Sequence, residues 1–217
     1  MSTEIANFIE KHKVITICRR LYGEELLNLV KALHQGGINL VEVTFDQSDV
    51  DGIKKTSEAI HMLVENFGKE MAIGAGTVVT KEQVKAAKDA GGSYIISPNV
   101  DVEIIKYTKE LGLVSMPGAM TPSEILTAHN AGADFVKLFP AGYLGLDYIK
   151  NIIAPISHVK LVATGGVTEE NLLEYLKLDF AGVGISGRLT DKKLIALGNF
   201  QEFTKRAQVF SNIVTEY

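Results

Sequence analysis

Two charged residues stand inside apolar runs of this sequence, and together their types would support imine chemistry. Lys137 is the centre of the run 133–141 (ADFVKLFPA), and Glu42 lies within 39–45 (NLVEVTF). Burial among apolar neighbours disfavours a charged ammonium and favours an amine that attacks carbonyls. A carboxylate facing that amine in a dry site would move the protons that the reaction needs. A buried Glu42–Lys137 ion pair that only stabilises the fold is the alternative, and it is disfavoured because desolvation offsets the Coulombic gain.

A lone lysine in an apolar run more often points at solvent from one face of an amphipathic strand. The alternation in this run argues against that reading. Phe135, Lys137 and Phe139 share one face of a strand, while the other face carries Val136 and Leu138, so neither face is polar. Strands that are apolar on both faces belong in buried parallel sheets. The rest of the chain must therefore build such a sheet.

The composition excludes several classes of protein. The chain has 217 residues, of which 46% are hydrophobic and 22% charged, with a formal charge of −4 and no basic stripe, so a nucleic-acid partner is not expected. Its single cysteine, Cys18, rules out an internal disulfide and a cysteine zinc site, and we expect it to be a packed core thiol. The segment 1–7 lacks an apolar signal core and no window reaches the length of a membrane span, so we expect a cytoplasmic protein without a membrane partner.

After a predicted helix over 3–12, an apolar run, a loop and an amphipathic helix recur to the end of the chain. The apolar runs are 14–18, 40–44, 71–75, 94–97, 113–116, 135–139, 159–163 and 182–185. This alternation requires a parallel sheet. Eight units without a long insertion predict an α/β fold, a single (β/α)8 TIM barrel with an N-terminal helix that spans 1–217 as one domain. An open, doubly wound sheet is the alternative.

Helix starts support this division of the chain. Capping boxes are predicted at 80–83 and 121–124, N-caps at Asp101 and Thr168 before helices 102–111 and 169–176, and a last helix over 199–215.

The active site of such a barrel lies at the carboxyl ends of its strands. The residues at those ends are Arg19, Arg20, Glu42, Thr44, Gly76, Thr77, Pro98, Asn99, Pro117, Gly118, Lys137, Phe139, Thr164, Gly165, Gly166, Ser186 and Gly187.

Glycines mark the last two strand ends as a phosphate site. Thr164-Gly165-Gly166 and the segment 182–187 (GVGISG) would expose backbone N–H groups to an anion. The second segment also matches G-x-G-x-x-G, but no βαβ half follows it, so a dinucleotide is not expected. The five histidines fall away from the strand ends, and we expect no metal.

Several motifs together give the chain a family resemblance. They are Glu42, 74–77 (GAGT), 96–98 (ISP), 116–118 (MPG), 137–140 (KLFP) and 164–166 (TGG). With these in order, residues 13–189 resemble the class I aldolases of 2-dehydro-3-deoxyphosphogluconate (KDPG) and 4-hydroxy-2-oxoglutarate (KHG).

The resemblance implies a retro-aldol lyase without a cofactor, commonly a homotrimer, that releases pyruvate and glyceraldehyde 3-phosphate. In the family the residue matching Lys137 forms a Schiff base with the 2-keto carbon, and the residue matching Glu42 moves protons through a bound water. The remaining matches are Thr77 and Thr164 against the pyruvate portion, Pro98 and Phe139 as its walls, and Gly165, Gly166 and the last strand loop with Gly184, Ser186 and Gly187 at the 6-phosphate.

Two positions depart from the family pattern. Asp46 stands where many members carry an arginine for the substrate carboxylate, and Arg19 is a candidate replacement. Ser186-Gly187 stands where the family reads Gly-Ser. KDPG cleavage is the leading hypothesis, with 2-dehydro-3-deoxy-6-phosphogalactonate or unphosphorylated KHG as alternative substrates. A non-catalytic barrel that binds a phosphosugar, or an isomerase or epimerase, is a remoter alternative.

Overall fold

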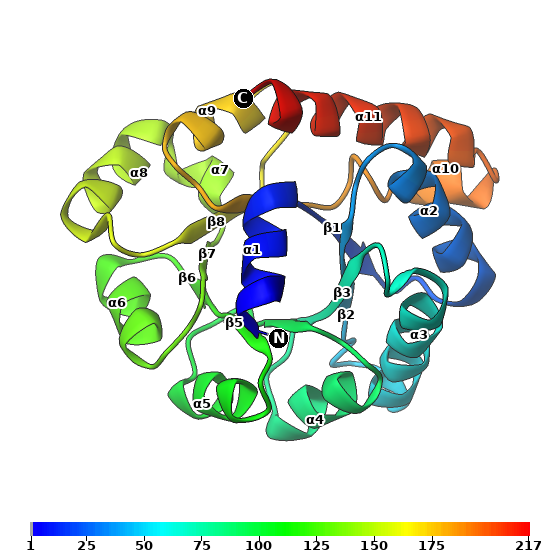
Figure 1. Ribbon diagram of the computed structural model, residues 1–217, viewed down its shortest axis with the longest axis horizontal. Coiled ribbons are helices and arrows are strands. Elements are labelled where there is room, and N and C mark those ends of the chain that lie inside the picture. Colours follow the sequence, from blue (N-terminus) through cyan, green and yellow to red (C-terminus); the bar gives the residue numbers. More distant parts are fainter. Residues whose placement is uncertain (1) are drawn as a thin grey trace.

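The apolar runs form the strands of one parallel sheet in the computed structural model, which describes residues 2–217 (Figure 1). The strands are β1 (Val14–Arg19), β2 (Leu40–Thr44), β3 (Ala72–Gly76), β4 (Tyr94–Ile96), β5 (Val114–Met116), β6 (Gly118–Ala119), β7 (Val136–Leu138), β8 (Leu161–Thr164) and β9 (Gly182–Ile185). Their order in the sheet is β5-β4-β3-β2-β1-β9-β8-β7-β6.

The sheet is a nearly closed barrel with nine strands where the sequence predicts eight. Its two end strands, β5 and β6, are consecutive in the chain and are separated only by Pro117, which has no N–H to continue a ladder. The Lys137 N–H donates to the Pro117 carbonyl at 2.9 Å, and the Phe139 N–H donates to Ala119 at 3.0 Å. The predicted run 113–116 thus corresponds to β5, and β6 is an additional short strand after Pro117 that backbone hydrogen bonds link to β7.

Helices surround the strands, and α1 lies across the middle of the ring (Figure 1). The helices are α1 (Ser2–His12), α2 (Gly23–Gln35), α3 (Gly52–Phe67), α4 (Lys81–Asp89), α5 (Val102–Glu110), α6 (Pro122–Asn130), α7 (Ala141–Leu144), α8 (Leu146–Ile153), α9 (Leu172–Lys177), α10 (Lys192–Ala196) and α11 (Phe200–Glu216), with a 3₁₀ turn at Ala154–Ile156. None of the helices described within 2–217 combines the length and apolarity that a membrane crossing needs.

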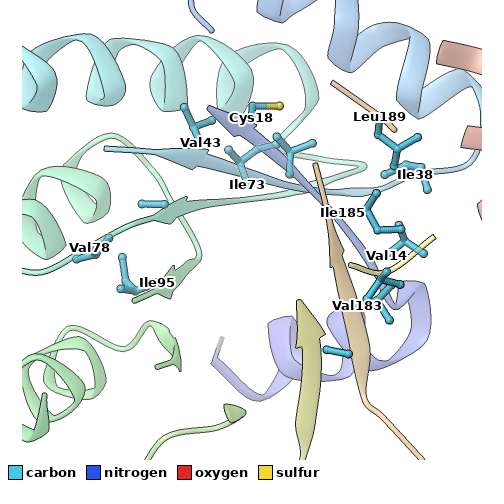
Figure 2. Packing of buried hydrophobic residues seen from close by; sticks show 14 of the residues in the cluster. Val14, Cys18, Ile38, Val43, Ile73, Val78, Ile95, Val183, Ile185 and Leu189 are labelled. Atoms are coloured by element: carbon cyan, nitrogen blue, oxygen red, sulfur yellow. The ribbon is translucent and has the colours of Figure 1, made fainter. Parts of the chain in front are cut away.

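In most of the longer strands, alternate residues enter two separate apolar clusters. The outer cluster packs between strands and helices and includes Val14, Cys18, Val43, Ile73 and Val183 (Figure 2). The inner cluster fills the barrel at the amino ends of the strands, and Ile9 of α1 belongs to it. Its strand residues include Ile15, Leu40, Tyr94, Val114 and Val162. The amino end of the barrel is therefore packed, which leaves the carboxyl ends for a cavity.

Three predicted helix starts are confirmed and one is wrong. Both capping boxes form, and Asp101 caps α5. The helix predicted to start at 169 after Thr168 instead begins at Leu172, as α9. The Asn171 side chain accepts from the Thr168 N–H at 2.8 Å and donates to the Gly166 carbonyl at 2.9 Å. These bonds fold 166–171 into a turn that holds the loop after β8.

Candidate active site

Lys137 points into the barrel from β7. Its neighbours Val136 and Leu138 lie in the outer cluster, while Phe135 lies in the inner one. The Lys137 side chain is only 7% exposed, so the solvent-facing alternative is wrong. Its Nζ lies 5.1 Å from the centroid of the Phe139 ring, a cation–π distance. Within residues 2–217 the amine has no hydrogen bond or ion pair, so it is held by packing rather than by a carboxylate.

Glu42 is buried in β2 with 2% exposure and likewise has no hydrogen bond or ion pair to any described residue, 2–217. Burial raises the pKa of its carboxyl, and the positive charges of Lys137 and Arg19 oppose that rise. The two cations are therefore close enough for their fields to act on Glu42, yet neither contacts it. This arrangement does not fit a structural ion pair, whose gain depends on direct contact. It leaves Glu42 free to hold or release a proton.

The Glu42 carboxylate occupies space that Gly76 leaves open on the neighbouring strand β3. A Cβ built on Gly76 would lie 1.6 Å from Glu42 Oε1 and 2.3 Å from its Cδ. A Cβ on Gly74, two residues earlier, would lie 2.2 Å from the Tyr94 ring. Because strand β3 carries no side chain at either position, larger residues of its neighbours fill the barrel. Gly76 is thus a positioning residue for Glu42.

Two buried groups on which the Glu42 charge acts, Cys18 and Tyr94, are kept neutral. Burial, with a smaller contribution from the Glu42 charge, raises the pKa of the fully buried Cys18 thiol to about 12. Burial and the same charge raise the pKa of Tyr94 well above its ordinary value. Cys18 is therefore a packed core thiol, as predicted, and neither group supplies a competing nucleophile.

A cavity of about 460 Å³ opens at the carboxyl ends of the strands, and Lys137 lies in its wall. The other predicted binding residues that line it are Arg19, Thr77, Pro98, Phe139, Thr164, Gly165, Gly166, Gly184, Ser186 and Gly187. Sequence reasoning missed Ile17, Val167, Ile185 and Arg188, which also line it. Arg188 could have been noticed, because it directly follows Gly187 at the last strand end.

Some residues at the strand ends lie outside this cavity. Arg20 and Thr44 line a separate hollow of about 230 Å³, which shares Arg19 and Thr77 with the main cavity. Asn99, Pro117 and Gly118 do not line the main cavity.

The main cavity is cationic although the chain as a whole is anionic. Its charged lining residues, among those of 2–217, are Arg19, Lys137 and Arg188, and no carboxylate lines it. Three cations in one hollow favour a ligand that carries more than one negative charge.

Asp46, which departs from the family pattern, is committed to Arg20. Its Oδ2 lies 2.7 Å from Arg20 Nε, and its Oδ1 accepts from Arg20 Nη2 at 3.1 Å. Hydrogen bonds from Ser48, and the Arg20 guanidinium, lower the pKa of the Asp46 carboxyl. The pair directs Arg20 to the side hollow, so Arg19 is the β1 arginine that reaches the main cavity.

Thr77 adopts a left-handed backbone, with φ of 55°, that a non-glycine residue adopts only at a cost. Gln47 Nε2 donates to the Thr77 carbonyl at 2.7 Å, and Gln83 Nε2 donates to Gln47 Oε1 at 2.9 Å. Gln83 is itself fixed as the third residue of α4 in the Thr80 capping box. A chain of amides thus holds Thr77 at the cavity, and no motif in the sequence indicated Gln47.

The loop after β8 is held by close backbone contact. Gly165 and Gly166 have φ values of 86° and 81°, which favour glycine. The Gly142 N–H donates to the Gly165 carbonyl at 2.7 Å, and a Cβ on Gly142 would lie 2.7 Å from the Gly166 α-carbon. Gly142 therefore allows α7 to fix the shape of this loop. Sequence reasoning missed it.

No metal centre is formed by the described part of the chain. Across 2–217 there is no group of three or more His, Cys, Asp or Glu residues placed to hold an ion.

The barrel fold places a buried lysine in the wall of a cationic cavity and a buried glutamate on strand β2. The chain belongs to the KDPG and KHG aldolase family, whose profile matches residues 5–206, and it is therefore a lyase. A 2-dehydro-3-deoxy-6-phosphogalactonate aldolase of Escherichia coli K12 is 34% identical over 180 residues, which cover 82% of this chain and 85% of that protein. A 2-dehydro-3-deoxy-phosphogluconate aldolase of Haemophilus influenzae is 27% identical over 212 residues, 97% of each chain.

A solved structure extends the comparison. The KDPG aldolase of Legionella pneumophila, with pyruvate captured at low pH as a covalent carbinolamine intermediate, superposes with a TM-score of 0.82. It is 29% identical to this chain, and the match covers 94% of this chain and 96% of that one.

Proposed function

We propose that this protein is a Schiff-base aldolase that cleaves 2-dehydro-3-deoxy-6-phosphogluconate to pyruvate and glyceraldehyde 3-phosphate. One observation carries the proposal. Lys137 and Glu42 are both buried, and neither has a hydrogen bond or ion pair within 2–217. Lys137 also lines a cavity whose charged lining residues, among those described, are all cations. Charged groups buried without partners are costly for stability, so a reaction is the better explanation of their presence.

Lys137 and Glu42 would carry out the successive steps of the cleavage. Lys137 Nζ attacks the C2 carbonyl, and loss of water from the carbinolamine leaves a cationic imine. The C3–C4 bond then breaks, its electron pair moves toward the imine nitrogen to form an enamine, and the C4 hydroxyl proton passes through a water to Glu42. Return of a proton to C3 and hydrolysis of the imine release pyruvate and restore the free amine.

Three groups of lining residues would each bind a different part of the substrate. Arg19 takes the carboxylate in place of the family arginine that Asp46 replaces. Thr77 and Thr164 contact the pyruvate portion between Pro98 and Phe139. The backbone N–H groups at the glycine end of the cavity bind the 6-phosphate, and that end consists of Gly165, Gly166, Gly184, Ser186 and Gly187.

The chemistry is tested by trapping with pyruvate. Sodium borohydride should reduce the imine and add a pyruvyl mass at Lys137, located by peptide mass spectrometry. The Lys137→Met variant is the control and should gain no mass. Wild-type protein that gains none would overturn the proposal. A binding protein without catalysis would instead keep its affinity for the phosphosugar acid in Lys137→Met and show no turnover in either form.

2-Dehydro-3-deoxy-6-phosphogalactonate, the C4 epimer, is the second candidate substrate. It is favoured by the Escherichia coli relative that is 34% identical and carries that name. Values of kcat/KM for the two phosphorylated epimers and for KHG decide between them. The cationic cavity predicts that KHG, which lacks the phosphate, is the poorest of the three.

The family resemblance also predicts a homotrimer in the cytoplasm. Light scattering on the purified protein should give three times the 23.6 kDa chain mass. A mass of one or two chains would contradict the trimer without affecting the chemistry.

A further inference from the structure

Arg188 is a cation of the main cavity that directly follows its glycine end in the chain. It follows Gly187 in the loop after β9, and it lines the cavity together with Gly165, Gly166 and Ser186. The backbone there is fixed from α11, because Arg206 Nη1 donates to the Arg188 carbonyl at 3.1 Å.

The Arg188 guanidinium bonds to the segment that follows the other glycine loop. Its Nε donates to Glu169 Oε2 at 2.9 Å, its Nη2 bonds to Glu169 Oε1, and Nη2 lies 3.6 Å from Glu170 Oε1. The salt bridge thus joins the loop after β8 to the loop after β9. Neither carboxylate lines the cavity, whereas Arg188 does.

This ion pair is of a kind that a phosphate dianion can displace. The Arg188 side chain is 48% exposed and that of Glu169 is 29% exposed, so solvent weakens their attraction. A guanidinium has five N–H donors in a planar fork that matches phosphate oxygens, and a phosphate carries more charge than one carboxylate.

The geometry points to Arg188 as a specificity-determining residue that binds the substrate phosphate, with Glu169 as the partner it gives up. The inference rests on the proposed aldolase function and adds to it a side-chain ligand for the phosphate. A side-chain ligand at this position would also compensate for Ser186-Gly187, which departs from the Gly-Ser of the family pattern.

The test compares two reactions of the full-length enzyme. Cleavage of the phosphorylated sugar acid uses the glycine end, whereas exchange of pyruvate methyl protons with D₂O uses only the Lys137 and Glu42 end. Arg188→Met should raise KM for the phosphorylated substrate about 10-fold to 100-fold, because a charge-assisted hydrogen bond is lost. It should leave the rate of pyruvate exchange within about twofold, which also shows that the variant is folded.

Two further variants sharpen the test. Lys192→Met removes a nearby exposed cation that lines a neighbouring hollow rather than this cavity, so it should change KM less than about twofold. Glu169→Gln keeps an acceptor for Arg188 but removes the competing charge. It should lower both KM for the phosphorylated substrate and the inhibition constant of inorganic phosphate.

Three results would overturn the inference. These are an unchanged KM in Arg188→Met, an equal effect of Lys192→Met, or a KM that rises in Glu169→Gln. Loss of pyruvate exchange in the wild-type enzyme would instead contradict the proposed function itself, so the two failures are distinguishable.

Discussion

The two ends of the cavity hold their charges in opposite ways. At the Lys137 end, the amine of Lys137 and the carboxyl of Glu42 are buried and have no hydrogen bond or ion pair within the described chain. At the glycine end, Arg188 is half exposed and already bonded to Glu169. A buried ionisable group without a hydrogen bond or ion pair is costly for stability but is not committed to another residue, whereas an exposed ion pair costs little and can exchange its partner. The difference separates a region suited to bond making from one suited to recognition.

The largest effect should come from removing the amine. Lys137→Met should lower kcat for cleavage by at least about 10⁴-fold, since no other lysine among residues 2–217 lines the cavity to form an imine. Stopped assays with the phosphorylated substrate measure this loss. Residual activity above about one hundredth of wild type would show that the Lys137 end of the cavity is not where the bond is broken.

Removing the carboxylate should lower activity and raise stability together. Glu42→Gln should reduce kcat by about 10² to 10⁴, the usual contribution of a positioned acid or base. Because burial raises the pKa of Glu42, its ionised form disfavours the folded state, and this loss of stability grows as the pH rises through the folded-state pKa.

The variant should therefore melt at a higher temperature than wild type at pH 8. That difference should disappear as the pH falls below about 4.5, where the carboxyl is protonated in both states. Calorimetry at the two pH values checks this, and each 1 kcal/mol corresponds to about 2 to 4 °C for a chain of this size. A melting temperature equal to that of wild type at pH 8 would contradict the unpaired state of Glu42.

A methyl group at position 76 should act through Glu42. Gly76→Ala should displace the carboxylate and lower kcat by about 10-fold to 100-fold, because the new Cβ would overlap Oε1. In the double variant with Glu42→Gln, the second change should cost almost nothing in kcat, as residues that act through one group are not additive. Additive losses would show that Gly76 matters for another reason.

A smaller effect should follow from loosening Thr77. Gln47→Glu is nearly isosteric but cannot donate to the Thr77 carbonyl, and it should raise KM for pyruvate in the exchange reaction about tenfold with little change in kcat. Asp46→Asn is the adjacent control. It should change the same KM less than about twofold, because Asp46 holds Arg20 outside the main cavity. Equal effects of the two variants would show that the hydrogen bond to Thr77 is not what matters.

Much of the strand and helix pattern followed from the sequence because it depends on neighbours along the chain. Period-two alternation around Lys137 indicated a strand buried on both faces, and capping boxes located two helix starts. The predicted helix start at Thr168 was wrong because the Asn171 side chain accepts from the Thr168 N–H and folds residues 168–171 into a turn. The structure has nine strands because the two residues after Pro117 pair with β7, and a pairing of two residues leaves no apolar pattern in the sequence.

By itself, the sequence determined that Lys137 would be buried, that the strand ends would meet, and which family the motifs resemble. Only the tertiary structure decided that Glu42 and Lys137 do not touch, that Gly76 makes room for the carboxylate, and that Arg188 lines the glycine end. The reason is physical. Burial of a strand follows from its own pattern of side chains. Contacts between strands also depend on their register and on which glycines leave space for a neighbouring side chain, and both are fixed only when the barrel packs.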